Sequence, residues 1–238
     1  MCRWLVYKGA PILIGSLTHE PEHSLVKQSK NGGYYPGCND PQRLRNLSVN
    51  GDGFGLAWYT AGRAERGSCL FRCITPAWNN FNLQNIVLHT TSSLVFAHVR
   101  AVHGSYGTTS RNNISEDNCH PFVHGRYTFM HNGDVAGFAS LKRHLRQALP
   151  NALYDSIVGA TDSEHAFGVL LDEIGGDLSR ELSASELSEA VERMINRITA
   201  LQKAHGITKG SSLNFAVTDG RHIVCTRCRN NAAEAPPS

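Results

Sequence analysis

Residues 1–15 read MCRWLVYKGAPILIG, with a cysteine directly behind the initiator methionine and an apolar stretch behind the cysteine. Aromatic and branched aliphatic side chains dominate residues 3–14, which is typical of a strand that enters a core. We expect Met1 to be removed because Cys2 is small, so that the mature chain begins with a thiol and a free α-amino group. An α-amino group titrates at about 7.7–8.0 and can act as a base near neutral pH. Cys2 is therefore a candidate nucleophile that carries its own base.

Strand-like stretches dominate the first half of the chain. We expect strands in GDGFGLAWYT (51–60), GSCLFRCIT (67–75), SLVFAHVRAV (93–102) and RYTFMHNGDVAGF (126–138). The last of these is expected to end in a turn at Asn132–Gly133. LQNIVLHTTS (83–92) is expected to form a short helix. The polar stretches 18–50 and 104–119 are expected to be loops, the first with one helical turn around Ser24–Gln28.

Helical patterns dominate the second half. Helices are predicted at about 138–149, from Thr161 onward, where a capping-box pattern begins, and at about 185–204, where apolar residues recur at helical period. SLNFAVTDGRHIVCTR (212–227) alternates around Asp219–Gly220 and predicts a β-hairpin. Strands, helices and hairpin come in blocks rather than in alternation, so the order predicts an α+β fold rather than a doubly wound sheet.

The composition argues against several classes of protein. A length of 238 residues fits one sizeable domain, and a net charge of +3 without basic runs argues against nucleic acid or a membrane as partner. Seven cysteines spread along the chain are not the disulfide framework of a small secreted domain. Because we find neither a signal peptide nor a membrane-length apolar run, we expect a cytoplasmic protein. Residues 230–238 have no pattern, and we expect a disordered tail there.

Four polar stretches stand at the ends of expected strands or at the start of a helix. They contain Cys2, Arg100, Asn132 with Gly133, and Asp162. Taken singly, each has a structural explanation, because arginine ends strands, Asn-Gly forms turns and aspartate caps helices. Taken together, their roles are complementary. A thiolate that attacks an amide carbon creates an oxyanion that needs donors, while an arginine suits a carboxylate and an aspartate suits an ammonium group.

Motifs along nearly the whole chain resemble those of a known family. They are, in order, MCRWL (1–5), NGDGFGLAWY (50–59), ITPAWNN (74–80), FAHVRA (96–101), NCHPF (118–122), FMHNG (129–133), TDSEHAF (161–167) and LNFAVTDGRHIVCTR (213–227). With them the chain resembles the class II glutamine amidotransferase domains, which are N-terminal-nucleophile hydrolases. The resemblance is strongest to the amidotransferase-like subunit of the glutathione-degradation complex of fungi. It implies one domain over residues 2–229, an αββα sandwich of two antiparallel sheets between helical layers. Relatives continue beyond the position of Ser238, so we expect the sheets to be incomplete at the C-terminus.

The resemblance also implies roles for five residues. Cys2 attacks the γ-glutamyl carbonyl, and its own α-amino group shuttles the proton. The side chain of Asn132 and the backbone N–H of Gly133 form the oxyanion hole. Arg100 binds the α-carboxylate of the glutamyl group, and Asp162 binds its α-ammonium group.

Supporting roles are expected for residues around these five. NGDGFG is similar to the strand beside the nucleophile in the family, so we expect Asp52 near the new N-terminus and Gly53 or Gly55 at a close backbone approach. His98 and His131 are candidates for general bases. Because the N-terminal residue supplies its own base, we expect them to support the site or the core instead.

The function that the resemblance implies is hydrolysis of the γ-glutamyl bond of glutathione through a thioester on Cys2. A metallopeptidase-like protein partner is implied for the other part of the substrate. Two alternatives stay within the same chemistry, namely a γ-glutamyl hydrolase of ergothioneine biosynthesis and a simple glutaminase. A third is a truncated subunit without activity.

We expect no metal and no cofactor. Cys225 with Cys228 and Cys69 with Cys73 have spacings that could form a zinc site or a redox pair. All four lie in strand-like runs, where small apolar residues are common, so we favour a structural role for them.

Overall fold

The computed structural model describes residues 2–31, 49–101, 114–231 and 233–234. It divides into two compact units, of which unit 1 comprises Met1–Arg63 and Ser68–Pro121, and unit 2 comprises Ala64–Gly67 and Phe122–Ser238. Most of the two stretches expected to be long loops, residues 32–48 and 102–113, lies outside the described residues. No helix among the described residues is both long and apolar enough to span a bilayer.

Unit 1 contains a four-stranded antiparallel sheet. Its strands, in spatial order, are β1 (Arg3–Leu13), β4 (Thr91–Val99), β2 (Phe54–Trp58) and β3 (Cys69–Cys73). Arg3 pairs with Val99, and Val99 also pairs with Phe54 on its other side. The start of the chain is therefore held beside the end of β4 and the start of β2.

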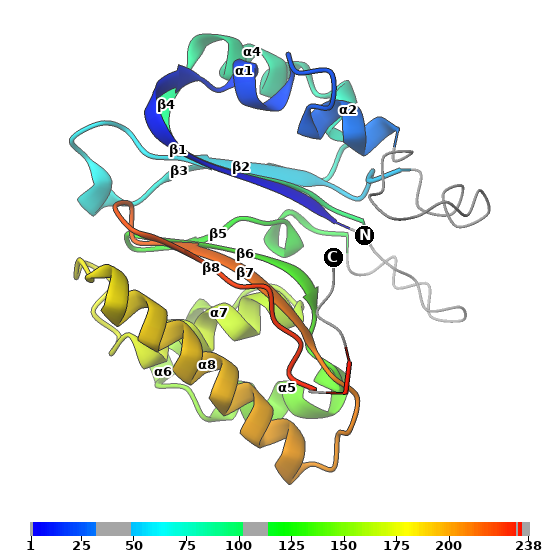
Figure 1. Ribbon diagram of the computed structural model, residues 1–238, viewed down its shortest axis with the longest axis vertical. Helices are drawn as coiled ribbons and strands as arrows, with labels where there is room; N and C mark the ends of the chain where they lie inside the picture. Colours follow the sequence, from blue (N-terminus) through cyan, green and yellow to red (C-terminus); the bar gives the residue numbers. More distant parts are fainter. Residues whose placement is uncertain (1, 32–48, 102–113, 232, 235–238) are drawn as a thin grey trace. The chain divides into compact units, whose positions relative to one another are not determined.

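Helices cover one face of this sheet (Figure 1). They are α1 (Gly15–Thr18), α2 (Leu25–Lys30) and α4 (Phe81–His89). Alternate residues of the central strands, among them Leu56, Val95 and Ala97, are buried with Leu83 and Val87 of α4 in one apolar cluster. The period of two that a strand requires thus separates the core face of the sheet from the face that carries Gly55 and His98.

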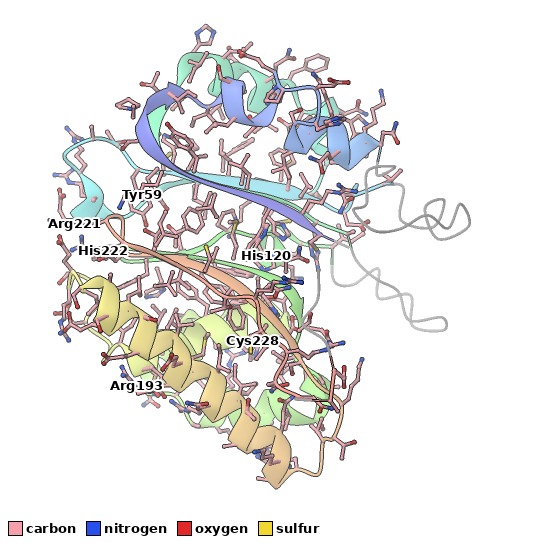
Figure 2. The ribbon with its side chains drawn as sticks, in the orientation of Figure 1. Tyr59, His120, Arg193, Arg221, His222 and Cys228 are labelled. Atoms are coloured by element: carbon pink, nitrogen blue, oxygen red, sulfur yellow. The ribbon has the colours of Figure 1, made fainter. Side chains whose placement is uncertain are left out.

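Unit 2 contains the second four-stranded antiparallel sheet. Its strands follow chain order and are β5 (Phe122–His124), β6 (Tyr127–Asp134), β7 (Ser212–Thr218) and β8 (Ile223–Cys225). Arg221 and His222 mark the tight turn between β7 and β8 (Figure 2). Asp219 shapes this turn, because its buried carboxylate accepts hydrogen bonds from the backbone N–H groups of both residues, at 2.8 and 2.7 Å.

The helices of unit 2 pack together on one side of its sheet (Figure 1). They are α5 (Phe138–Gln147), α6 (Asn151–Ser156), α7 (Asp162–Glu173) and α8 (Ala184–Ala204). The N-cap hydroxyl of Thr161 accepts from the N–H of Glu164, and Ser183 forms a full capping box with Glu186. The Thr161 cap fixes where α7 begins and the Ser183 cap fixes where α8 begins. The candidate residue Asp162 is the first residue of α7.

The prediction of an α+β fold with two antiparallel sheets and helices is confirmed. Each unit supplies one sheet and one helical layer, the components of the predicted sandwich. Short elements escaped prediction, namely α1, β5, α6 and the single 3-10 turns Ala64–Arg66, Ala77–Asn79 and Glu116–Asn118. They have too few residues to show a period.

The turn predicted at Asn132–Gly133 was wrong. Both residues lie inside β6, where Asn132 pairs with Asn214 and Gly133 pairs with Leu213 of β7. Asn-Gly is a local turn signal. Here the pairing with a strand about 80 residues later overrides that local preference.

The residues around the start of the predicted tail make contacts in the structure. Arg229 forms a β-bridge with Ser212, and the side-chain amide of Asn230 donates to Gln202 Oε1 at 2.7 Å and to Thr199 Oγ1 at 2.9 Å. Glu234 Oε1 accepts from the N–H of Gly210 at 3.1 Å. Residues 232 and 235–238 of the predicted tail lie outside the described residues.

Gly55 is a point of close backbone contact in unit 1. A Cβ atom built there would overlap the carbonyl oxygen of His120. We expect Gly55→Ala to lower the free energy of unfolding by about 2 kcal/mol or more, because backbone cannot move aside as a flexible side chain can. Urea unfolding measures the change. Gly51→Ala is the matched control, since its nearest neighbour is the Trp78 side chain at 3.3 Å, and an equal effect of both substitutions would contradict the prediction.

Candidate active site

The sulfur of Cys2 lies against the backbone at the end of β4. The N–H of Ala101 points at Cys2 Sγ at 3.4 Å, and Cys2 Sγ is 3.6 Å from the carbonyl oxygen of Ala101, which the thiol can donate to. The side chain is half-buried. The antiparallel pairing of Arg3 with Val99 explains this placement, because it carries the preceding residue of β1 past the residues that follow β4.

Arg100 lies next to Ala101 and is itself buried, with 7% of its surface exposed. Its backbone pairs with the two residues that precede β2, since its N–H donates to Gly53 O at 2.8 Å and its carbonyl accepts from the N–H of Asp52 at 3.2 Å. The structure thus brings together Cys2, Arg100, Asp52 and Gly53, four of the residues predicted for the site.

Gly53 has a φ of 106°, a backbone conformation that residues other than glycine rarely adopt. A Cβ atom there would lie 2.6 Å from Cys119 Sγ. Burial raises the pKa of the Cys119 thiol to about 11, although the positive charges of Arg100 and Arg72 oppose the shift. Cys119 is therefore a neutral thiol near pH 7 and a poor nucleophile, in spite of its place beside the candidate site.

His98, a predicted supporting residue, lies on β4 and is fully buried. Its ring packs on the ring of His120, with 4.4 Å between the centroids. His98 pairs across the sheet with Trp4 and with Gly55.

Asn132, Gly133 and Asp162 belong to unit 2. Asn132 and Gly133 lie near the end of β6, where the carbonyl of Asn132 accepts from the side-chain amide of Asn214 at 3.0 Å. A Cβ atom on Gly133 would overlap the carbonyl oxygen of Ser212. Glycine at 133 is therefore required by the close approach of β7, whatever role its N–H group has.

The carboxylate of Asp162 joins the start of α7 to the end of β6. Its Oδ2 accepts from the N–H of Val135 at 2.7 Å, and its Oδ1 accepts from the N–H of Ser163 at 2.8 Å. Each carboxylate oxygen can accept more than one hydrogen bond. Asp162 can therefore serve the fold and still bind an ammonium group.

His131, a buried residue of β6, also connects β6 to α7. Its ring is buried, with Nδ1 3.0 Å from Ser163 Oγ and Nε2 2.8 Å from the carbonyl oxygen of Ser212. Residues 131 to 135 of β6 and its extension are thus bound to α7 and β7 around Asn132 and Gly133.

Sequence reasoning missed Ser163 and His165, both on α7. His165 is fully buried, its Nδ1 lies 2.7 Å from the carbonyl oxygen of Thr161, and its ring meets the ring of Phe138 edge-on. Burial lowers the pKa of His165 to about 4. The signal that could have found both residues is the N-cap pattern of Thr161 and Glu164, which fixes the start of the helix and hence its inward face.

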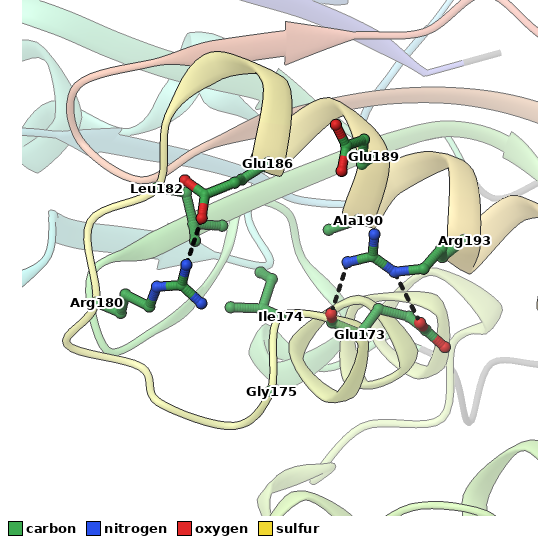
Figure 3. Close-up of a pocket in the computed structure, with 9 residues that line it drawn as sticks. All are labelled: Glu173, Ile174, Gly175, Arg180, Leu182, Glu186, Glu189, Ala190 and Arg193. Atoms are coloured by element: carbon green, nitrogen blue, oxygen red, sulfur yellow. Dashed lines mark hydrogen bonds and ion pairs between the residues drawn. The ribbon is translucent and has the colours of Figure 1, made fainter.

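Unit 2 also has a hollow of about 160 Å³ between the end of α7 and the start of α8 (Figure 3). Arg180 pairs with Glu186, and Arg193 Nε pairs with Glu173 at 3.3 Å. Each of the two arginines is thus paired with a glutamate. Because both guanidinium charges are already balanced, the hollow is a poor site for an anionic ligand.

The cysteine pairs considered for zinc belong to different units. Cys69 and Cys73 are the ends of β3 in unit 1, and Cys225 and Cys228 lie at and after β8 in unit 2. In the described part of the chain, histidine, cysteine, aspartate and glutamate form no group of three or more that could hold a metal ion.

Comparison with known proteins identifies the family. The sequence profile of the class-II glutamine amidotransferases matches residues 41–234. The chain belongs to this family.

Two curated relatives illustrate its range. The chain is 40% identical over 95% of its length to the "probable glutamine amidotransferase DUG3" of Saccharomyces cerevisiae, of which it spans 63%. It is 26% identical over 57% of its length to the γ-glutamyl-hercynylcysteine sulfoxide hydrolase of Mycobacterium tuberculosis, of which it spans 50%. The chain is thus shorter than either relative.

A solved structure shows the same fold. It is a glutamine aminotransferase class-II domain protein from Silicibacter pomeroyi, to which this chain is 27% identical. The superposition has a TM-score of 0.64 and covers 96% of this chain and 78% of the other.

We expect Asp162→Ala to lower the free energy of unfolding by about 1–3 kcal/mol, because two buried backbone N–H groups lose a charged acceptor. Asp162→Asn keeps one carbonyl acceptor and should cost less. Urea unfolding measures both. Asp134→Ala is the control, because Asp134 is an exposed carboxylate 3.8 Å from Lys209, and such surface pairs contribute little. An Asp162→Ala variant as stable as Asp134→Ala would contradict the structural role.

The lowered pKa of His165, about 4 against 6.5 for an exposed histidine, makes stability depend on pH. Between these values the unfolded chain binds a proton that the folded chain does not, so stability falls as the pH drops through this window. We expect the wild type to lose about 2 kcal/mol between pH 7.5 and pH 5 through this group. His165→Gln should remove that part of the loss in urea unfolding at the two pH values. His144→Gln, an exposed control on α5, should retain it, and an unchanged loss in His165→Gln would refute the assignment.

Proposed function

We propose that this protein hydrolyses γ-glutamyl amide bonds, with Cys2 as nucleophile after removal of Met1. The observation that supports the proposal most directly is the position of Cys2 Sγ, which lies 3.4 Å from the backbone nitrogen of Ala101. Ala101 directly follows the buried Arg100 in the chain. A nucleophile and a cation for a substrate carboxylate are thus parts of one local structure. Family membership supports the same chemistry.

In the proposed reaction the α-amino group of Cys2 takes the thiol proton, and the sulfur attacks the γ-carbonyl carbon. The oxyanion that forms accepts hydrogen bonds from the side-chain amide of Asn132 and the backbone N–H of Gly133. The amine leaves with the proton that the α-amino group returns, and a γ-glutamyl thioester remains on Cys2. Water then attacks the thioester, which releases glutamate and restores the thiol.

The glutamyl head of the substrate needs partners for its two charges. We assign its α-carboxylate to Arg100, whose planar guanidinium can donate two parallel hydrogen bonds. We assign its α-ammonium group to Asp162. The carboxylate of Asp162 already accepts two backbone N–H groups and is therefore fixed in orientation before a substrate arrives. Asp52 and Gly53 support this arrangement by binding the backbone of Arg100.

Glutathione is the substrate that we favour, because the motifs of the chain resemble most strongly those of the amidotransferase-like subunit of the fungal glutathione-degradation complex. The extensive similarity to a yeast protein named as a probable glutamine amidotransferase agrees with this choice. The products would be glutamate and cysteinylglycine. By analogy with the family we propose a metallopeptidase-like partner for cysteinylglycine and a cytoplasmic location. We propose residues 2–229 as the amidotransferase domain, to which Asn230 and Glu234 remain attached by hydrogen bonds. A second candidate is a γ-glutamyl thiol-histidine conjugate, since the mycobacterial relative is named as a hydrolase of such a compound. A glutaminase is the simplest variant of the same chemistry.

Intact mass spectrometry and a glutamate-release assay test the proposal together. We expect the purified protein to lack Met1 and to release glutamate faster from glutathione than from glutamine or a γ-glutamyl thiol-histidine conjugate. Cys2→Ala should abolish release, whereas Cys69→Ala, which removes an exposed cysteine of β3, should leave it unchanged. Asn132→Ala should lower kcat by about 100- to 1000-fold, the usual effect of losing one oxyanion donor. Retention of Met1, or full activity of Cys2→Ala, would refute the nucleophile, and a strong preference for glutamine would refute glutathione as substrate.

A further inference from the structure

His131 and Ser163 form a buried pair between the candidate oxyanion donors and Asp162. The carbonyl oxygen of Ser212, 2.8 Å from His131 Nε2, can only accept, so a neutral His131 carries its hydrogen on Nε2. Its Nδ1 is then an acceptor. Ser163 Oγ lies 3.0 Å from that nitrogen and donates to it.

Ser163 is also bound to Asp162. Its N–H donates to Asp162 Oδ1 at 2.8 Å, and its hydroxyl lies 3.2 Å from the same oxygen. The hydroxyl has only one hydrogen, and the acceptor nitrogen of His131 is the nearer partner. Because the backbone N–H already serves Asp162, Ser163 can satisfy His131 and Asp162 at the same time.

The ring of His131 is also in contact with the residues that follow it. A Cβ atom on Gly133 would lie 2.8 Å from His131 Nε2, so the ring borders the backbone of Gly133 directly. On another side the ring packs on Phe215 of β7, with 4.7 Å between the centroids. Rotation of the ring would therefore displace Gly133 or break the hydrogen bond to Ser212.

We propose that His131 and Ser163 are positioning residues, which set the backbone of Asn132 and Gly133 relative to the carboxylate of Asp162. This inference rests on the proposed function, in which these groups stabilise the oxyanion and bind the ammonium group. Hydrogen bonds formed only in the transition state affect kcat rather than substrate binding. A shift of the donors by a fraction of an ångström therefore lowers kcat and leaves KM nearly unchanged.

The fold does not depend on this pair alone. The N–H of Ala136 donates to Ser211 Oγ at 2.9 Å, and the carbonyl of Ala136 accepts from Gln202 Nε2 at 2.8 Å. Asn214 binds the carbonyl of Asn132, and Asp162 binds the N–H of Val135. We therefore expect the end of β6 to stay attached to its neighbours when the His131–Ser163 pair is removed. Its removal should shift the backbone of Asn132 and Gly133 only slightly.

The kinetic test compares Ser163→Ala, His131→Phe and the double variant with wild type in glutamate release from glutathione. His131→Phe keeps a ring beside Phe215 and removes both hydrogen bonds. We expect each single variant to lower kcat by about 10- to 100-fold with KM changed less than about twofold, and the double variant to lose no more than the larger single loss. Tyr127→Phe is the control, because it removes one hydrogen bond to Arg180 at the other end of β6 and should lower only the Tm.

A second readout does not require activity. The amide NMR signal of Gly133 should shift in Ser163→Ala, although residue 163 belongs to a different element, and should stay unmoved in Tyr127→Phe. A wild-type protein that releases no glutamate from any γ-glutamyl substrate would refute the proposed function. The NMR shift of the Gly133 amide in Ser163→Ala would then be the sole test of whether Ser163 positions the backbone of Gly133. Wild-type kcat in Ser163→Ala, a loss that Tyr127→Phe reproduces, or an unmoved Gly133 signal would overturn the positioning role.

Discussion

The hydrogen bonds of the Asp162 carboxylate to two backbone N–H groups are the interaction on which the candidate site in unit 2 depends. One of these groups, on Val135, belongs to the extension of β6, and the other, on Ser163, belongs to the first turn of α7. An ionised carboxylate at the start of a helix is also favoured by the helix dipole. A single side chain thus joins a strand end to a helix start, two and three residues beyond Gly133 and Asn132, which are themselves paired with β7.

In unit 1, backbone pairing brings the candidate residues together. The pairing of β1 with β4 places Cys2 beside Ala101, and the residues that precede β2, Asp52 and Gly53, bind the carbonyl and the N–H of Arg100. Strand register and backbone hydrogen bonds bring these residues together. A side chain at position 53 would press on Cys119 and take a strained φ of 106°, so glycine is needed for β2 to start there. In both units the candidate residues lie at strand ends, where the pairing of the strands restricts the position of the backbone.

The sequence predicts the long, periodic elements well. The alternation of 212–227, the apolar period of α8 and the cap at Thr161 each specify an element locally, and each is confirmed. The Asn132–Gly133 turn failed because a tertiary pairing with β7 outweighs local turn chemistry. The candidate residues were found by their types and motifs. The hydrogen bonds that hold them were not, because His131 meets Ser163 and Ser212 across 32 and 81 residues, and no local pattern encodes such contacts.

The segment that follows β8 has a practical consequence. Asn230 donates to the amide oxygen of Gln202 and accepts from the N–H of Ser211, at 2.7 Å in each case. Gln202 and Ser211 are both buried, and both hold Ala136. A truncation at the last strand would leave these interior groups unsolvated and unpaired. Expression boundaries or protease sites are therefore better placed beyond Glu234 than at Cys228.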